Sequence, residues 1–162
     1  LGDGNGWPGE WWLDIRDIEA LTPVMSARFE LAAEKGCDGV EPDNIDAFQN
    51  DSGFDITATD QVAYAKWLSL QAHGRGLSIG MKHAIALVPE LESSFDWALN
   101  ERCFEFDECA LLSPVIEAGK AVFHVEYQGD LSWCPRALEL GFSSLEKERL
   151  VGPEYRPCVP EG

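Results

Sequence analysis

The segment ECALLSPVIEAGKAVFHVEY, residues 108–127, combines a predicted helix with a predicted strand. Residues 108–119 form the helix, which ends at Gly119, a residue type that commonly stops helices. Residues 120–127 are rich in β-branched and aromatic side chains, which favour a strand, and they end in the polar pair Glu126 and Tyr127. A helix followed directly by such a strand is one unit of a parallel α/β fold.

The same alternation extends along the rest of the chain. The other predicted strands cover residues 11–16, 39–43, 77–83, 96–101 and 141–148. The other predicted helices cover residues 18–35, 57–73, 89–94 and 135–140, and the one at 57–73 begins with a capping-box pattern at Thr57. The tail GPEYRPCVPEG, residues 152–162, is predicted as coil. Six strands alternating with five helices predict a single α/β domain over residues 1–162.

Five predicted strands end in polar or ionisable side chains. These are Asp14 and Arg16, Glu41 and Asp43, Lys82 and His83, Asn100 and Glu101, and Glu126 and Tyr127. In a (β/α)8 TIM barrel the active site is built on this face, whereas an open doubly wound sheet binds only at a switch point. The pattern therefore favours the barrel. Because such a barrel normally has about 250 residues and eight strands, the sequence predicts a barrel truncated to about strands 3–8.

The composition limits the class of partner. Apolar residues make up 45% of the 162 residues, which indicates a globular protein, and no run is long enough to span a membrane. The net charge of −17 excludes nucleic acid as a partner and favours a cationic one. The first residues, LGDGNGWPGE, are no signal peptide, so we expect a mature chain or a fragment. We also expect a monomer.

The five cysteines are widely spaced and include no CxxC pair, which makes a zinc site improbable. Cys103 and Cys109 are placed to close a short disulfide loop, and Cys134 and Cys158 to fix the C-terminal segment. Cys37 would then be a buried thiol. Two disulfides predict a secreted protein; a cytosolic protein with five thiols is the alternative.

The stretch GVEPDNID, residues 39–46, concentrates three carboxylates at a strand end. Paired carboxylates in a cleft are the catalytic groups of glycoside hydrolysis, one ionised and one protonated. Crowding raises carboxylate pKa values, and Lys82 could hold one neighbour ionised. This interpretation requires no metal and no other cofactor. A divalent cation among Glu41, Asp43 and Asp46 is the alternative.

Other catalytic motifs are missing or weak. No GxSxG motif indicates an α/β-hydrolase, and no GxGxxG motif follows a strand. We interpret His73 and His124 as structural residues. The tryptophans Trp7, Trp11 and Trp12 are candidates for stacking on sugars, although tryptophan alone is weak support.

Six segments between residues 6 and 127 together resemble glycoside hydrolase family 114, the endo-α-1,4-polygalactosaminidases. They are GWPGEWWLDIR, KGCDGVEPDNID, SGFDITATDQ, AHGRGLSIGMK, FDWALNERCFEFDEC and AGKAVFHVEY, in this order. The resemblance implies a (β/α)8 barrel, secretion, and retaining cleavage of α-1,4-linked galactosamine in a microbial exopolysaccharide, galactosaminogalactan. It places residues 11–16 at the third barrel strand.

The resemblance also implies individual roles. Asp43, at the end of the fourth barrel strand, matches the proposed nucleophile, and Glu101, at the end of the sixth, matches the proposed acid/base. Further candidates for substrate binding are chosen by position alone. They are Asp14, Arg16, Glu41, Asn44, Lys82, Asn100, Glu126 and Tyr127. For Asp14 and Arg16, a structural salt bridge at the barrel rim is an equally good interpretation.

The sequence departs from the family pattern after Lys82, where the family usually carries Asn and then Asp but this chain has His83 and Ala84. The departure, together with the expected truncation, supports a second hypothesis, a carbohydrate-binding relative that has lost catalysis. Under the leading hypothesis, the acidic cleft would attract a cationic or partly deacetylated polysaccharide. A metal-dependent α/β enzyme without sugar specificity is the third hypothesis.

Overall fold

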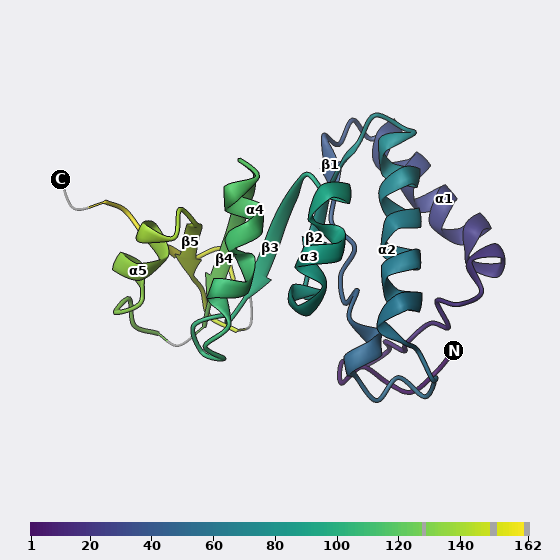
Figure 1. Ribbon diagram of the computed structural model, residues 1–162, viewed down its shortest axis with the longest axis horizontal. Coiled ribbons are helices and arrows are strands. Elements are labelled where there is room, and N and C mark those ends of the chain that lie inside the picture. The colour runs from purple at the N-terminus through teal and green to yellow at the C-terminus, as the bar shows by residue number, and fades with distance from the viewer. Residues whose placement is uncertain (128, 150–151, 161–162) are drawn as a thin grey trace.

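The protein, described here by a computed structural model for residues 1–127, 129–149 and 152–160, contains one curved sheet. Its strands are β1 (Gly39–Val40), β2 (Ser78–Lys82), β3 (Trp97–Glu101), β4 (Ala121–Glu126), β5 (Ser143–Glu146) and β6 (Arg156–Pro157). They lie in sequence order, with β1 to β5 parallel and β6 antiparallel to β5 (Figure 1). Parallel neighbours in sequence order are what a (β/α)8 barrel requires.

Helices connect the parallel strands. They are α1 (Ile18–Glu34), α2 (Ala58–His73), α3 (Val88–Leu91), α4 (Ser113–Glu117) and α5 (Cys134–Glu139), with short 3₁₀ turns at Ala47–Gln49, Ile85–Leu87, Glu92–Ser94 and Cys109–Leu112. In α2, the Thr57 side chain accepts a bond from the Asp60 N–H and the Asp60 carboxylate accepts one from the Thr57 N–H. This confirms the predicted capping box. No helix of the described residues is long and apolar enough to cross a membrane.

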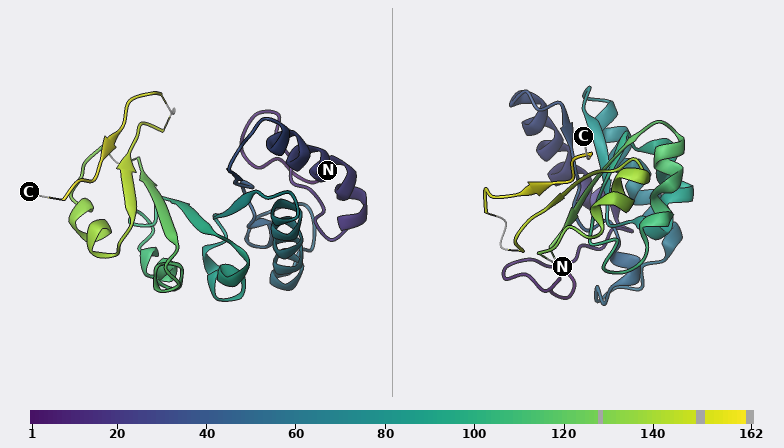
Figure 2. Two further views of the ribbon diagram at one scale, coloured as in Figure 1. Left: turned by 90° about the horizontal axis from the view of Figure 1, so that it is seen from above. Right: turned by 90° about the vertical axis from the view of Figure 1, so that its left-hand side faces the viewer.

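The sheet is an open arc, with α2 to α5 along its convex side (Figure 2). Along β4, buried Val122, His124 and Glu126 alternate with the more exposed Ala121 and Phe123. Because strand side chains point alternately to opposite faces, one face of the sheet is covered and the other is open. The sheet and its helices form part of a (β/α)8 barrel, as predicted.

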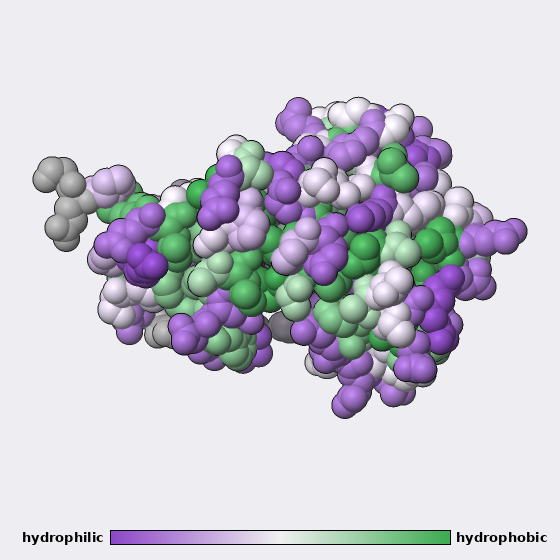
Figure 3. Space-filling view, viewed as in Figure 1, coloured by the Kyte–Doolittle hydropathy of each residue, from purple (hydrophilic) through white to green (hydrophobic). Residues whose placement is uncertain are grey.

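Two sets of residues mark the two faces. On the covered face, His124 contacts the aromatic rings of Trp133 and Phe142, which flank α5. On the open face, the Trp97 ring contacts Phe123, and a Cβ atom on Gly80 would overlap Trp97. Hydrophobic residues also gather over the middle of the molecule, around α3 and β3 (Figure 3).

Two sequence predictions of secondary structure were wrong. Residues 11–16 contain no strand: Trp11 forms only a single bridge with Gly4. The adjacent backbone of Trp12 accepts a bond from Gly2 and donates one to Asp3. This segment therefore bonds to the first residues of the chain instead of joining the sheet. The tail, predicted as coil, contributes the short strand β6.

Both predicted disulfides are present, Cys103–Cys109 and Cys134–Cys158. Cys37 is a free cysteine, but it is exposed, so the prediction that it is buried was wrong. Cys37 directly follows Gly36, whose positive φ of 74° ends the turn after α1 and carries the chain away from the helix toward β1. The thiol therefore lies in a surface connection.

The longer disulfide gives a stability prediction. Replacing both Cys134 and Cys158 by serine should lower the free energy of unfolding by about 3 kcal/mol. The disulfide joins residues that are 24 positions apart in the sequence, and it therefore lowers the entropy of the unfolded chain. Urea unfolding followed by circular dichroism measures the change. Cys37→Ser is the matched control, since it removes an exposed thiol without opening a link. Equal effects of the two changes would contradict the prediction.

Candidate active site

Lys82 is the centre of a cluster of charged side chains at the carboxyl ends of the parallel strands. Its Nζ atom lies 3.1 Å from Asp43 Oδ1 and 3.7 Å from Glu101 Oε2. It also lies 3.9 Å from Glu41 Oε1. Lys82 ends β2 and Glu101 ends β3, while Glu41 and Asp43 follow β1. The ends of β2 and β3 and the loop directly after β1 thus bring these four side chains together.

His83 connects two of these carboxylates through the two nitrogens of its ring. Nδ1 lies 3.3 Å from Asp43 Oδ1, and Nε2 lies 2.9 Å from Glu101 Oε2. The Tyr127 hydroxyl donates a hydrogen bond to the other Glu101 oxygen, Oε1. Asp43 and Glu101 therefore share two cationic neighbours, and Glu101 has a neutral donor in addition.

The backbone turns sharply after each key residue. Asn44, His83 and Arg102 have φ values of 55°, 63° and 66°, and each directly follows a charged residue of the cluster. Residues other than glycine rarely adopt this backbone conformation, and it recurs at functional sites. The Asn44 N–H also donates a hydrogen bond to Asp43 Oδ1 at 2.8 Å. The turns at His83 and Arg102 end β2 and β3, and the turn at Asn44 lies in the loop after β1.

The surroundings divide the carboxylates into two groups. The hydrogen bond with His83, assisted by Lys82, lowers the pKa of Asp43 to about 2 against the effect of burial. The same His83 bond, with Tyr127 and Lys82, lowers the pKa of Glu101 to about 2. Burial raises the pKa values of Glu41 and Asp46. Lys82 was thus correctly expected to help keep a neighbour ionised, but burial contributes more than mutual repulsion to the raised values.

The two cations are stabilised by the same contacts. Burial lowers the pKa of His83, but its bonds to Asp43 and Glu101 outweigh burial and raise the pKa to about 9. Burial also disfavours the Lys82 ammonium, yet the surrounding carboxylates raise its pKa above the usual value. With Lys82 and His83 both charged and in contact with Asp43, a divalent cation at this carboxylate would be repelled. The geometry thus disfavours the metal-site hypothesis.

A comparison with known families identifies the family of the chain. The profile of glycoside-hydrolase family GH114 matches residues 1–158. The chain belongs to family GH114. A crystal structure of Ega3 from Aspergillus fumigatus, in complex with galactosamine, is similar to it with a TM-score of 0.90 and 35% sequence identity. The match covers 98% of this chain and 68% of the Ega3 chain.

A more distant structure shares the fold alone. The glycoside hydrolase domain of PelA from Pseudomonas aeruginosa matches the GH114 chain with a TM-score of 0.60 and 12% identity, covering 90% of this chain and 68% of that one. A search of curated proteins gives no significant match. The resemblance predicted from the six sequence segments is confirmed by the family match and by Ega3.

The structure places the other predicted site residues of the GH114 chain in three environments. Tyr127 and Asn44 contact the cluster, as described above. Asp14 and Arg16 form a bidentate ion pair, with Arg16 Nε 2.7 Å from Asp14 Oδ1, and Arg16 also donates to the carbonyl oxygen of Asp55. Among the described residues, neither has a hydrogen bond or ion pair with the cluster, which agrees with a salt bridge at the rim.

Asn100 and Glu126 are buried on the covered face of the sheet. Glu126 Oε1 accepts a hydrogen bond from the Phe104 N–H and contacts His124 Nε2. Each residue directly precedes one that reaches the site, Glu101 or Tyr127. Alternation along the strand therefore turns Asn100 and Glu126 toward the helices. Both side chains are buried, so neither has exposed surface that a substrate could contact.

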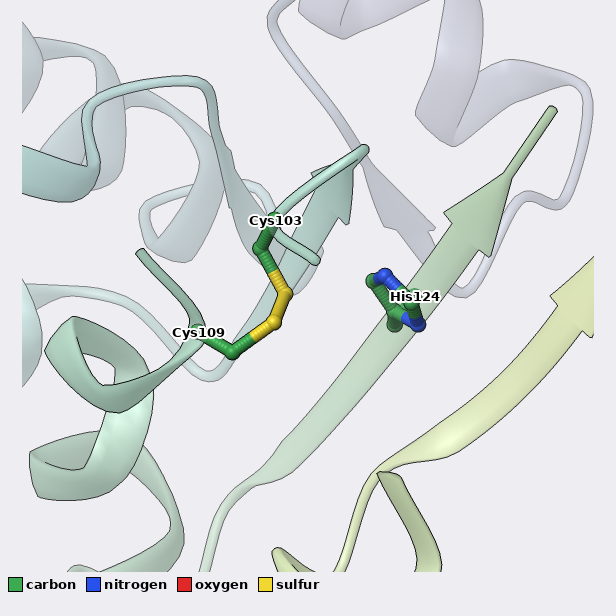
Figure 4. Close-up of side chains that lie close together, drawn as sticks. All are labelled: Cys103, Cys109 and His124. Carbon is green, nitrogen blue, oxygen red and sulfur yellow. A yellow bond between two sulfur atoms is a disulfide. The ribbon is translucent and has the colours of Figure 1, made fainter. Parts of the chain in front are cut away.

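His124 lies close to a disulfide without forming a metal centre (Figure 4). Cys103, Cys109 and His124 offer ligand atoms within 4.8 Å of one another, but the two sulfurs are bonded to each other. His124 Nδ1 contacts Ser144 Oγ and Nε2 contacts Glu126 Oε1, so both ring nitrogens have partners. The structural role predicted for His124 agrees with these contacts.

Two cavities lie beside the cluster in the GH114 fold. One, of about 990 Å³, is lined by Asp43, Asn44, Trp11 and Trp12 together with residues of α1, among them Met25 and Phe29. The other, of about 520 Å³, begins at Tyr127 and continues along residues 146–149 and 154–156. In sheet order, Glu101 at the end of β3 lies between them. The site thus has open space on both sides of its carboxylate pair.

Proposed function

We propose that this protein cleaves internal α-1,4 linkages of a galactosamine polymer by a retaining mechanism. The observation that carries the proposal is the contact of Asp43 and Glu101 with the same two cations, Lys82 and His83. Glycoside hydrolysis requires two carboxylates on either side of the scissile bond. The galactosamine complex of Ega3, at 35% identity, supports the sugar class.

The separation of the carboxylates supports retention. The Asp43 and Glu101 oxygens that contact Lys82 are at most about 7 Å apart, because they lie 3.1 and 3.7 Å from one Nζ atom. Retaining enzymes hold their carboxyl groups about 5–5.5 Å apart, whereas inverting enzymes extend to roughly 9 Å to admit a water. The limit lies below most of the inverting range, which begins at about 6.5 Å, and so it favours retention.

The proposed roles follow from exposure and hydrogen bonding. The Asp43 side chain is 54% exposed and ionised, so it can reach the anomeric carbon as the nucleophile. Glu101 is 25% exposed and would protonate the leaving oxygen, then activate water in the second step. Tyr127 holds Glu101 in place through its hydroxyl.

The cavities support binding of a polymer instead of a single sugar. Trp11 is 54% exposed and lines the cavity that contains Asp43, so its ring is available for stacking on a sugar. The second cavity would take residues of the polymer beyond Glu101. A free galactosamine amine is cationic, and the net charge of −17 would attract it. We also propose that the protein is secreted, as its two disulfides support.

One observation favours a second function, binding without cleavage. The contact with His83 holds Glu101 ionised, whereas a general acid must carry a proton. If His83 cannot give up its proton to Glu101, the site would bind the polymer but leave the bond intact.

Incubation with partly deacetylated α-1,4-linked galactosaminogalactan tests the proposal. We expect release of oligosaccharides that keep the α configuration, observed by proton NMR of the first products. We also expect kcat/KM to fall several-fold as salt rises from about 50 to 500 mM, because salt screens the attraction between the acidic cleft and the amines. The fully acetylated, neutral polymer is the control for the salt effect. Polymer that binds to the folded protein without being cleaved would favour the second function.

A further inference from the structure

We propose that His83 is a positioning residue that holds Asp43 and Glu101 at opposite ends of one imidazolium and stores the proton that Glu101 passes to the leaving sugar. The inference rests on the proposed function and deepens it, because it assigns a source to the proton that catalysis consumes.

The geometry of the ring supports this role. Nε2 is 2.9 Å from Glu101 Oε2 and Nδ1 is 3.3 Å from Asp43 Oδ1, so an imidazolium can direct one N–H to each carboxylate. The side chain is only 24% exposed. A neutral ring could donate to one carboxylate only, which would leave a lone pair facing the other anion. The two contacts therefore favour the doubly protonated form.

The groups around His83 come from several elements. Asp43 and Glu41 follow β1, Glu101 ends β3, and the cation Lys82 directly precedes His83. Asp46 and Glu108 also interact electrostatically with the ring. The carboxylates outnumber the ammonium, and the pKa of His83 rises to about 9. The proton consequently remains on the ring at neutral pH, while Glu101 is ionised.

The proton can be followed through one catalytic cycle. As the glycosidic bond breaks, the Nε2 proton moves to the ionised Glu101 carboxylate, which passes this proton on to the leaving oxygen, and Asp43 forms the bond to the sugar. His83 is then neutral. When water attacks the sugar, Glu101 takes a proton from the water and returns one to Nε2, and the Asp43 carboxylate is released. No further reactant is needed, and the protons balance.

This sequence of steps predicts where activity is lost at high pH. With His83 as the store, the proton is available until the ring titrates, near pH 9. In His83→Asn, Glu101 must carry the proton itself, beside Lys82 and Tyr127, which both favour its ionised form. We therefore expect the basic limb of kcat/KM to move down by at least two pH units. About two units above that limb, the variant should retain roughly 1% of its maximal activity.

His83→Asn is a suitable variant because asparagine tolerates a positive φ better than most residues, and the φ of His83 is 63°. The ratio of variant to wild-type kcat/KM, measured from about pH 5 to 9, cancels titration of the substrate amine. A ratio that is constant with pH, even if low, would mean a purely structural role and would overturn the proposal.

A second measurement does not depend on activity. Among the three histidines of the chain, the His83 ring signals are identified in proton–carbon NMR by their loss in His83→Asn. We expect these signals to titrate near pH 9 in the wild-type protein, and at lower pH in Asp43→Asn and Glu101→Gln. A wild-type midpoint at or below about 6.5, the value of free histidine, would overturn the inference. If the wild-type protein fails to cleave the polymer, the proposed function fails, and the midpoint still decides where the proton lies.

Discussion

Asp43→Asn and Glu101→Gln are each expected to lower kcat on the galactosamine polymer by at least about 10³-fold while the protein stays folded. Asp43 would form the bond to the sugar, and Glu101 would move the proton; general acid–base catalysis alone contributes about 10²–10⁴. Both changes keep the shape of the side chain. The Asp43 carboxylate is 54% exposed, so loss of its surface contacts should cost about 1 kcal/mol of stability or less.

A substrate with a leaving group that needs no protonation separates the two roles. With an activated aryl galactosaminide, Glu101→Gln should still form the glycosyl-enzyme intermediate, and its turnover would be limited by the water step. Asp43→Asn should form no intermediate, because the attacking oxygen is missing. Mass spectrometry of the stopped reaction detects the covalent adduct. An adduct in Asp43→Asn but none in Glu101→Gln would reverse the two assignments.

Glu105→Gln is the matched control for the change at Glu101. Glu105 lies in the loop after the same strand, where it pairs with Arg102 at 3.8 Å on the protein surface. We expect its kcat to stay within about twofold of wild type, since an exposed pair of this kind contributes little. A loss similar to that of Glu101→Gln would show that the loop, and not the carboxylate, is what the reaction needs.

The sequence predicts the helices of this protein well because their signals are local. The Thr57 capping box and the glycines after α1 and α4 lie within a few residues of the elements that they bound. The failure at residues 11–16 has the opposite cause. An apolar run becomes a strand only when a neighbour pairs with it, and this one bonds to the first residues of the chain. Pairing is a long-range property that a single segment does not carry.

The sequence predicted the candidate site only in outline, because it shows which residues end the strands but not directly which way each side chain points. Charged strand ends indicated Glu101 and Tyr127, but also their neighbours Asn100 and Glu126, which face the helices. Strict alternation along β3 and β4 could have separated the two sets. The role of His83 was missed, because its ring reaches Asp43 and Glu101 only through a positive φ that no sequence pattern indicated. Its position at a strand end, directly after Lys82, was the signal that the sequence offered.

Lys82→Met is expected to lower kcat/KM by at least about 10²-fold and to move the acid limb of the pH profile upward. The Lys82 side chain is 12% exposed, and its Nζ contacts Asp43, Glu101 and Glu41. Without the ammonium, the negative charges of these carboxylates repel one another more strongly, and His83 is the cation that remains in contact with Asp43 and Glu101. The pKa values of the carboxylates therefore rise. Asp43 must be ionised to attack the sugar. Its pKa is about 2 in the wild-type protein, so the loss of Lys82 should make activity fall at a higher pH, by about one unit or more.

Lys120→Met makes the same chemical change at the other end of the sheet. Lys120 precedes β4 and binds Glu92 Oε1 at 2.6 Å, with a side chain 25% exposed. This control should lose some stability, because it breaks a partly buried ion pair, but its kcat/KM and acid limb should not change. Equal losses in both variants would attribute the effect of Lys82 to general destabilisation. If only Lys82→Met shifts the acid limb of the pH profile, then the contact of Lys82 with Asp43 is what keeps the proposed nucleophile ionised.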